Sequence, residues 1–434
     1  MFIDPKKATI APSADVPLPR ERAVIWVLWL TYGAFYFCRT NLSAAAKDMT
    51  LPLEKGGLDL SKEQVGYILA SLKIAYGLGQ GLNGQLAERF SPRVLLALGM
   101  LGSAALNVLF GLGTGFYFLL FVWACNGYAQ SLGWTPCMRV VANWVPVFRR
   151  GRAIGLIGTG YQVTLGLTFL VATWAVQWQG WRAALFVPAG LLTLTAIFML
   201  LVLDESPQDH SSANQAADHP RAYPASRPGS FFDNIILTLQ NPALWLLGLS
   251  LGLLNACRFG YLDWGLTHLQ EVQKSPIGES GVKYALLPVG AVAGVYLAGW
   301  ATDRFFGGRR APVICLLLLV LAGLTPLYHT AAREGGSWVI PLLMVIGFCI
   351  YGPQVLLVGT APADLARRGT SAAAAGFVNF LGYMGAAAGD VVTGRVLDKE
   401  TWGWQVAIYV WAGWALVAAL AAALLWNATA RADR

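Results

Sequence analysis

The sequence predicts an all-α membrane protein with twelve transmembrane helices, and three observations support that prediction. Of the 434 residues, 56% are hydrophobic and 12% are charged, whereas roughly 25% are charged in an ordinary soluble domain. A membrane-spanning helix needs about 20 mostly apolar residues, so this hydrophobic content suffices for about twelve spans. A polar segment near the middle of the chain divides the spans into two sets of six. These features exclude a soluble enzyme held by a single anchor.

Hydropathy, together with the positions of glycine, proline and charge, predicts each span in order. The first set is expected near residues 23–48, 64–87, 93–113, 116–143, 152–178 and 181–203. The second set is expected near residues 242–269, 282–302, 311–331, 337–360, 370–394 and 403–427. The predicted organisation is thus a tail at 1–22, a first half at 23–203, a linker at 204–241, a second half at 242–427 and a tail at 428–434.

The positive charge of the chain predicts its orientation. The net charge is +8, but long apolar runs separate the basic residues, which argues against a nucleic-acid-binding stripe. With the N-terminus inside, sixteen lysines and arginines of the tails and short loops fall on the cytoplasmic side and nine on the other. This excess predicts cytoplasmic termini and a cytoplasmic linker. Residues 1–20 lack the apolar core of a cleavable signal, and the short loops favour a bacterial inner membrane.

Few residues in the spans suggest chemistry. All six cysteines lie in apolar stretches without a CxxC spacing, which predicts buried thiols and neither disulfides nor a metal site. No phosphate loop or nucleophile elbow is present, so we expect no enzymatic activity and no cofactor. Four cations remain inside the predicted spans, and they are the informative ones: Arg39, Lys73, Arg139 and Arg258.

Two short motifs recur in both halves of the chain. Gly84-Gln-Leu-Ala-Glu88-Arg89 follows span 2, and Gly299-Trp-Ala-Thr-Asp303-Arg304 follows span 8. Cys38-Arg39 in span 1 recurs as Cys257-Arg258 in span 7. The loop motif G-x-x-x-[DE]-R resembles the signature of the major facilitator superfamily. The resemblance implies two six-helix bundles with pseudo-two-fold symmetry, a midplane site and alternating access. It also implies that Glu88, Arg89, Asp303 and Arg304 form charge pairs that hold an inner gate shut in one conformational state.

Arg39 and Arg258 are the strongest candidates for ligand binding. Each lies 16 residues from the expected start of its span (39 − 23 and 258 − 242), or about 24 Å along a helix. A charged residue at such depth is costly, so a functional site is its default interpretation; a structural arginine is the alternative. Asp263 lies about 140° around the helix from Arg258, too far to pair easily on one face. Two unpaired arginines favour an anionic ligand with phosphate or carboxylate oxygens.

Five stretches in the spans resemble the organophosphate:phosphate antiporter family. They are Tyr32-Gly-Ala-Phe-Tyr36-Phe-Cys-Arg39-Thr-Asn, Gly133-Trp-Thr-Pro-Cys-Met-Arg139, Cys257-Arg258-Phe-Gly-Tyr-Leu-Asp263-Trp264, Ile350-Tyr-Gly-Pro-Gln354 and Gly376-Phe-Val-Asn-Phe-Leu-Gly-Tyr383. This resemblance implies that Arg39 and Arg258 bind phosphate. The similarity runs along nearly all the spans.

The chain departs from the family pattern at two positions. Gln80 stands where the family has a lysine, and Tyr161, next to Gln162, stands where the glycerol-3-phosphate members have a histidine. Lys73 lies seven residues before Gln80 on nearly the same face. It is either a displaced substrate cation or a side chain that extends to the membrane surface. These departures argue against glycerol 3-phosphate as the substrate.

Other polar residues in the spans are candidates either for ligand contact or for helix packing. Helical spacing places Tyr32, Tyr36, Arg39 and Ser43 on one stripe. The remaining candidates lie in the fourth, tenth and eleventh spans: Asn126, Gln130, Gln354, Asn379, Tyr383 and Asp390. Asp390 could alternatively couple transport to protons.

The resulting functional hypothesis is a monomeric secondary transporter that exchanges an organic phosphate, such as a sugar phosphate or phosphoglycerate, for inorganic phosphate. Its partners would be these anions and the lipid bilayer, and not nucleic acid. Three alternatives remain open. One is a proton- or gradient-coupled carrier of a carboxylate or polyhydroxy acid, and another is a transporter-like receptor for a sugar phosphate. The third is a purely structural membrane protein, against which the paired intramembrane arginines argue.

Overall fold

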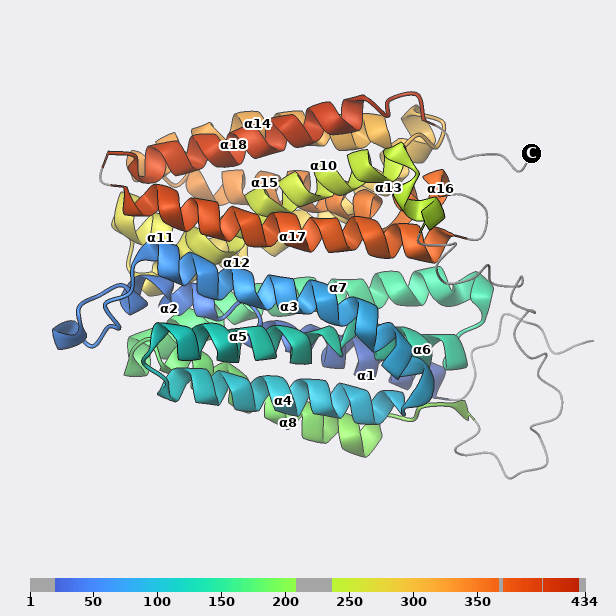
Figure 1. The fold of residues 1–434 in the computed structure, drawn as a ribbon, viewed down its shortest axis with the longest axis horizontal. Helices are drawn as coiled ribbons and strands as arrows, with labels where there is room; N and C mark the ends of the chain where they lie inside the picture. The colour runs from blue at the N-terminus through green and yellow to red at the C-terminus, as the bar shows by residue number, and fades with distance from the viewer. Residues whose placement is uncertain (1–19, 208–235, 367–369, 400, 429–434) are drawn as a thin grey trace, which may run out of the picture.

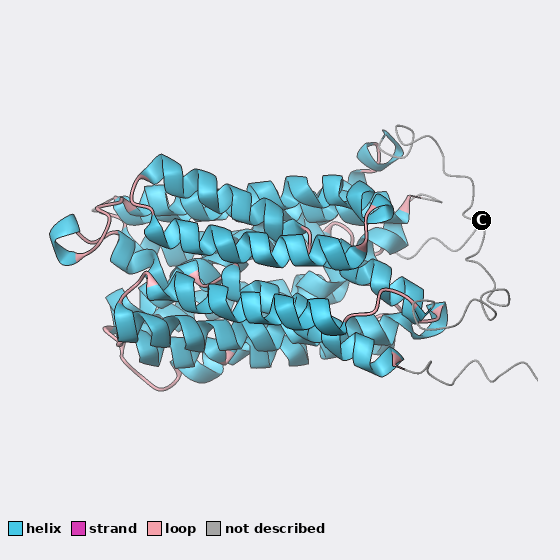
Figure 2. Ribbon diagram, turned by 90° about the horizontal axis from the view of Figure 1, so that it is seen from below, coloured by secondary structure: helices cyan, strands magenta, loops and turns pink. Residues whose placement is uncertain are grey.

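The computed structural model describes residues 20–207, 236–366, 370–399 and 401–428. These residues form helices joined by short loops, and no strand occurs among them (Figure 2). The parts of the N-terminal tail, linker and C-terminal tail predicted at 1–19, 208–235 and 429–434 lie outside the described residues, as do Arg367 and Arg368.

The first half of the chain contains the helices that correspond to spans 1–6. They are α1 (Glu21–Ala34), the 3₁₀ turn η1 (Phe35–Cys38), α2 (Leu42–Met49), α3 (Lys62–Arg89), α4 (Pro92–Leu112), α5 (Phe116–Ser131), α6 (Trp134–Trp144), α7 (Val147–Gln179) and α8 (Ala183–Val202). A short 3₁₀ turn, η2 (Leu53–Lys55), lies in the loop before α3.

The second half contains the helices that correspond to spans 7–12. They are α10 (Pro242–Phe259), α11 (Gly265–His268), α12 (Ile277–Ala285), α13 (Leu287–Phe305), α14 (Ala311–Arg333), α15 (Val339–Val355), α16 (Ala361–Leu365), α17 (Ser371–Asp398) and α18 (Gly403–Ala423). Three π-helical segments connect them: η4 (Gly260–Trp264), η5 (Leu269–Gln273) and η6 (Leu356–Thr360).

Eight stretches of the described chain are long and apolar enough to cross a membrane. The other four predicted spans are helical as well: residues 21–49, 62–89, 116–144 and 371–398. Compared with the eight apolar stretches, these four either are interrupted by a break in the helix or contain more polar residues. The breaks, charges and carboxamides are described below. Together these segments account for all twelve predicted spans.

The helices form two groups that lie side by side (Figure 1). The blue-to-green helices α1–α8 form one group, here called the N bundle, and the yellow-to-red helices α10–α18 form the C bundle. We call the end where α1 begins and α8 ends the linker end, and the opposite end, where α3 begins and α17 ends, the loop end. The two bundles meet where α3 packs against α17 and where α7 packs against α12 and α13.

Local sequence signals explain where several helices begin. Ser61 accepts a hydrogen bond from the backbone N–H of Gln64, whose side chain binds the Ser61 N–H in return, so a capping box starts α3. Ser91 caps α4 and Asn241 caps α10, and each is followed by a proline in the first helical turn.

Glycines allow the close contact between α3 and α17. A Cβ atom at Gly66 of α3 would lie 2.6 Å from the backbone oxygen of Asp390 in α17. A Cβ at Gly394 of α17 would lie 2.5 Å from the backbone oxygen of Lys62. Larger side chains would force the helices apart at both points, so the two bundles touch backbone to backbone near the loop end.

Candidate functional site

A cavity of about 670 Å³ lies between the two bundles. Its walls come from α1, α3, α6 and α7 of the N bundle and from α13, α15, η6 and α17 of the C bundle. It reaches toward the linker end, where Gly151 and Arg152 of α7 line it. None of the described residues that line it is acidic, and Arg152 is the charged one among them. The cavity is therefore suited to a neutral or anionic ligand.

Eight of the predicted ligand contacts line this cavity. They are Tyr32, Tyr36, Gln80, Tyr161, Gln162, Gln354, Asn379 and Tyr383. The Gln80 amide donates a hydrogen bond to the hydroxyl of Tyr76, four residues earlier, at 2.9 Å. The cavity surface thus combines tyrosine rings with carboxamides from both bundles, a surface that can bind hydroxyl groups and stack against a sugar ring.

Arg39 lies at a break in the first span. The α-helix ends at Ala34, tightens into η1 and resumes only at Leu42. The guanidinium is buried and donates through Nε to Oε1 of Gln130 at 3.0 Å. It also lies 4.5 Å from the ring centre of Tyr76 and 4.6 Å from that of Tyr36. Among the described residues Nη2 has no hydrogen-bond partner and no carboxylate pairs with the cation.

Arg258 occupies the corresponding place in the C bundle. It precedes the π-helical segment η4, and its side chain is buried. Nη2 donates to the Tyr351 hydroxyl at 3.2 Å, and the rings of Phe259 and Tyr351 each lie 4.8 Å from the guanidinium carbon. In the described part of the chain its Nε has no partner, and none of the ion pairs there includes it. Both arginines therefore keep a donor available for an anion.

A layer of tyrosines separates the arginines from the cavity. Neither guanidinium is part of the cavity lining, whereas Tyr36, Tyr76 and Tyr351, which cover them, are. Tyr36 stacks on Tyr161 with ring centres 5.1 Å apart, and Tyr76 packs against Tyr383 at 4.6 Å. An anion in the cavity would meet tyrosine hydroxyls first and the arginines directly behind them.

Asn126 and Gln130 do not line the cavity. The Asn126 amide donates to the backbone oxygen of Cys38 at 2.9 Å, and the Gln130 amide donates to that of Phe35 at 3.0 Å. Both carbonyls lie where the α-helix of the first span is interrupted, and in a membrane a backbone carbonyl without a partner is costly. The two side chains thus stabilise the break that positions Arg39, and Gln130 also orients its guanidinium.

Lys73 is also outside the cavity, in an arrangement that neither sequence interpretation anticipated. Its ammonium donates to the Asp263 carboxylate at 2.6 Å and makes a shorter contact with Asp390. The exposed fraction of each of the three side chains is at most 4%. Snorkelling toward the membrane surface is therefore wrong for this conformation, because two carboxylates of the C bundle hold the ammonium inside the protein. We call these three residues the buried triad.

Further contacts join the bundles at the loop end. The Lys62 ammonium pairs with Glu271 at 2.7 Å, and Arg395 pairs with Glu63 at 2.5 Å. The Asp398 carboxylate accepts hydrogen bonds from the backbone N–H groups of Lys62 and Glu63 at 2.8 and 2.6 Å. Asp398 of the C bundle thereby binds the first turn of α3 in the N bundle. The loop end is closed in this conformation.

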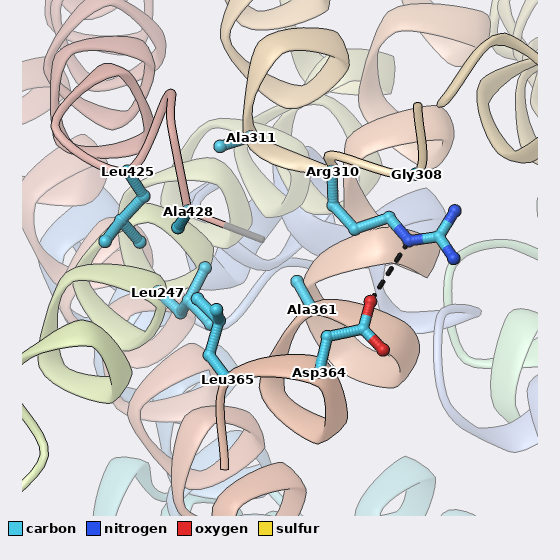
Figure 3. A pocket seen from close by; sticks show the side chains of 9 residues that line it. All are labelled: Leu247, Gly308, Arg310, Ala311, Ala361, Asp364, Leu365, Leu425 and Ala428. Atoms are coloured by element: carbon cyan, nitrogen blue, oxygen red, sulfur yellow. Dashed lines mark hydrogen bonds and ion pairs between the residues drawn. The ribbon is translucent and has the colours of Figure 1, made fainter. Parts of the chain in front are cut away.

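The charges at the linker end pair within each bundle. Asp303 pairs with Arg310 at 2.9 Å. Arg310 also pairs with Asp364 at 3.2 Å, as Figure 3 shows. These three residues all belong to the C bundle. The predicted partner Arg304 is exposed, and so is Arg89, while the Glu88 side chain lies outside the described residues. Among the ion pairs between described residues, none joins the two bundles at this end, so Arg89, Asp303 and Arg304 form no inner-gate pair with one another here.

The cavity lining also contains residues that the sequence interpretation does not select, among them Tyr76, Tyr351 and Arg152. Helical spacing could have identified the two tyrosines, because Tyr76 lies four residues before Gln80 and Tyr351 three before Gln354. Arg152 was counted only as a marker of orientation. No local signal separates it from the neighbouring arginines 149 and 150, which bind Glu21 and backbone carbonyls.

Comparison with known proteins finds relatives that match this chain over nearly all of its length. It is 28% identical over 438 residues to the glycerol-3-phosphate transporter of Bacillus subtilis, covering 96% of this chain and 95% of the relative. It is 27% identical to a probable hexose phosphate transport protein of Chlamydia trachomatis, with 95% and 92% covered. It is 26% identical to the membrane sensor protein UhpC of Escherichia coli, with 89% and 87% covered.

Solved structures support the same fold. A bacterial homologue of the human lysosomal transporter Spinster, in an inward-facing and unoccupied conformation, superposes with a TM-score of 0.72 at 16% identity, covering 95% of this chain and 96% of that one. The prediction of a twelve-helix, two-bundle membrane fold is confirmed, as is the resemblance to the organophosphate:phosphate antiporter family. Residues 28–390 match the Major Facilitator Superfamily, and the chain belongs to that superfamily.

Proposed function

We propose that this protein exchanges an organic phosphate for inorganic phosphate across a bacterial inner membrane, with both termini in the cytoplasm. The observation that carries the proposal is the pair of buried arginines, one from each bundle. Each has an unpartnered N–H group, and among the described residues neither has a carboxylate partner. A monomer is sufficient, because one chain supplies both arginines and the whole cavity wall.

The chemistry of the pair favours a phosphate group. A guanidinium offers several N–H donors in a rigid plane, which matches the oxygens of phosphate. The aromatic contacts and single hydrogen bonds of Arg39 and Arg258 leave both positive charges uncompensated. A phosphate dianion would neutralise both and would draw the two bundles together around it. Exchange follows, since a carrier that holds two buried, uncompensated charges changes conformation less readily when it is empty.

The contacts at the two ends support alternating access. The loop end is held by ion pairs and by the cap that Asp398 provides for α3, whereas the cavity reaches the linker end. These contacts must break before the loop end can open. The linker end must then close, and we propose that Asp303 and the charges near it take part in closing it. The described conformation would then be the one open to the cytoplasm.

The class of organic phosphate that we propose rests on the names of the relatives and on the two positions at which this chain departs from the family pattern. Relatives of this chain are named as transporters of glycerol 3-phosphate and hexose phosphate. In this cavity Gln80 and Tyr161 occupy places where the family pattern has a lysine and a histidine. The lining therefore offers hydroxyls and carboxamides instead of further cations. This composition favours a polyhydroxylated substrate, such as a sugar phosphate or a phosphoglycerate, over glycerol 3-phosphate.

The test is counterflow in proteoliposomes. Purified protein is reconstituted with internal phosphate, and uptake of labelled external phosphate is measured in competition with unlabelled organic phosphates. We expect uptake that requires internal phosphate and that Arg39→Ala abolishes. Uptake that depends on a pH gradient but not on internal phosphate would indicate a carboxylate carrier. Binding of a sugar phosphate without flux would indicate a receptor, the activity suggested by the name of the sensor relative.

A further inference from the structure

The buried triad has an unbalanced charge. Lys73 contributes one positive charge, and Asp263 and Asp390 would contribute two negative charges if both were ionised. All three side chains are at least 96% buried, because the exposed fractions are 3%, 4% and 0%. A net negative charge at such a site costs several kcal/mol. A buried pair of carboxylates with one counter-ion relieves this cost when one of the two takes up a proton.

Lys73 is the cation that pairs with the two carboxylates in the described part of the chain. The ring of Phe259 lies 4.5 Å from the Lys73 ammonium and 4.8 Å from the guanidinium carbon of Arg258, but among the described residues Arg258 forms no ion pair with either carboxylate. The other ionisable groups on the elements that pack against α3, α17 and η4 have their own contacts or are at least partly exposed: Glu63 of α3 pairs with Arg395 of α17, Asp364 of α16 pairs with Arg310, His268 of α11 contacts Tyr328 and His329, Lys47 and Asp48 of α2 are half-buried, and Tyr409 of α18 is exposed. Lys73 is thus the direct counter-ion of both carboxylates.

The triad also lies across the boundary that must open. Lys73 belongs to α3 of the N bundle, whereas Asp263 and Asp390 belong to η4 and α17 of the C bundle. The backbone oxygen of Asp390 is the atom that Gly66 of α3 approaches most closely. Separation of the bundles at the loop end would remove Lys73 from the carboxylates and admit water to all three groups. The solvated carboxylates would then both ionise at neutral pH.

We propose that the buried triad is a proton-binding site that couples closure of the loop end to the uptake of one proton. In the step, one carboxylate of the Asp263/Asp390 pair takes a proton from water at the loop end (COO⁻ + H⁺ → COOH) as Lys73 docks. The triad changes from a net charge of −1 to zero. Opening reverses the step and releases the proton to the same side.

This linkage gives the gate a defined response to pH. Acid conditions favour the closed, protonated triad, and the ratio of closed to open molecules falls as pH rises. The fall is at most tenfold per pH unit, the limit for one linked proton. Proton binding at the triad does not involve the transported anion, so this proposal can be tested independently of the proposal of phosphate exchange.

The test measures the loop-end opening directly in the full-length protein. Spin labels are placed at Tyr117 of the N bundle and Glu334 of the C bundle, which are both exposed near the loop end. Five of the six native cysteines are buried, so labelling of introduced cysteines dominates. The distance distribution is recorded by pulsed electron resonance between pH 5.5 and 8.5. In the otherwise unaltered protein we expect the long-distance population to grow several-fold per pH unit over part of this range.

Three variants separate a proton site from a structural ion pair. Asp390→Asn and Asp263→Asn each imitate a protonated carboxylate, so we expect a closed loop end whose population no longer depends on pH. Glu279→Gln is the matched control, because Glu279 pairs with Lys283 on its own helix and joins no bundles; its pH response should equal that of the parent. The proposal would be overturned if Asp390→Asn or Asp263→Asn folded normally and its loop-end opening kept the pH response of the parent. It would also be overturned if loop-end opening in the parent did not respond to pH.

Discussion

Replacing Arg258 with lysine tests whether the forked geometry of the guanidinium, and not only its charge, binds the anion. In the structure Arg258 Nη2 donates to Tyr351 at 3.2 Å, and Nε is left without a partner among the described residues. A lysine keeps the positive charge but presents its donors at a single point. It therefore loses at least one charge-assisted hydrogen bond to a phosphate, worth about 1.5–3 kcal/mol.

This loss corresponds to phosphate binding that is weaker by about 10- to 150-fold. The measurement is phosphate binding to purified Arg258→Lys protein by isothermal titration calorimetry, with counterflow in proteoliposomes as the second assay. Arg333→Lys is the control, because Arg333 is an exposed cation at the end of α14 and does not line the cavity. If Arg258→Lys bound phosphate with an affinity within twofold of the parent, and the control were also unchanged, then the positive charge alone would suffice for binding. That result would refute the role of the guanidinium geometry.

Two further substitutions test the packing that positions the site and closes the loop end. Gln130→Leu removes the acceptor of Arg39 Nε and the donor to the Phe35 carbonyl. We therefore expect thermal unfolding to show a free energy of unfolding that is lower by about 1–3 kcal/mol, and phosphate binding to weaken at least fivefold. An unchanged free energy of unfolding together with unchanged phosphate binding would contradict this. Gly66→Val places a side chain where even a Cβ would lie 2.6 Å from a backbone oxygen of α17. Spin-label distances should then show a loop end that is open more often, whereas Gly413→Val, with no atom within 4 Å of its added Cβ, should leave it closed.

The helices and the arginine pair could be predicted because their signals are local or repeated. An apolar run of about 20 residues must become a helix in a bilayer, since every backbone polar group needs an internal partner. The recurrence of Cys-Arg at residues 38–39 and 257–258 identified two equivalent positions before any contact was known. The structure buries both arginines, and among the described residues neither pairs with a carboxylate.

The roles of the carboxamides could not be predicted in the same way. Asn126 and Gln130 looked like ligand contacts because polar residues in a span are costly unless they have a function. They bind the carbonyls of Cys38 and Phe35, which lie where the first span breaks. The break itself leaves no clear mark on hydropathy, so the partners of these side chains remained hidden.

By itself, the sequence determined that this is a twelve-helix membrane protein built from two related halves, each with one arginine deep in its first span. Only the tertiary structure decided which polar groups face the cavity, which stabilise the backbone and which join the bundles. Lys73 shows the reason most clearly, because its two carboxylate partners lie 190 and 317 residues away along the chain. Hydropathy and helical spacing report on neighbours within a few turns, whereas the cost of a buried charge depends on which distant side chains meet it.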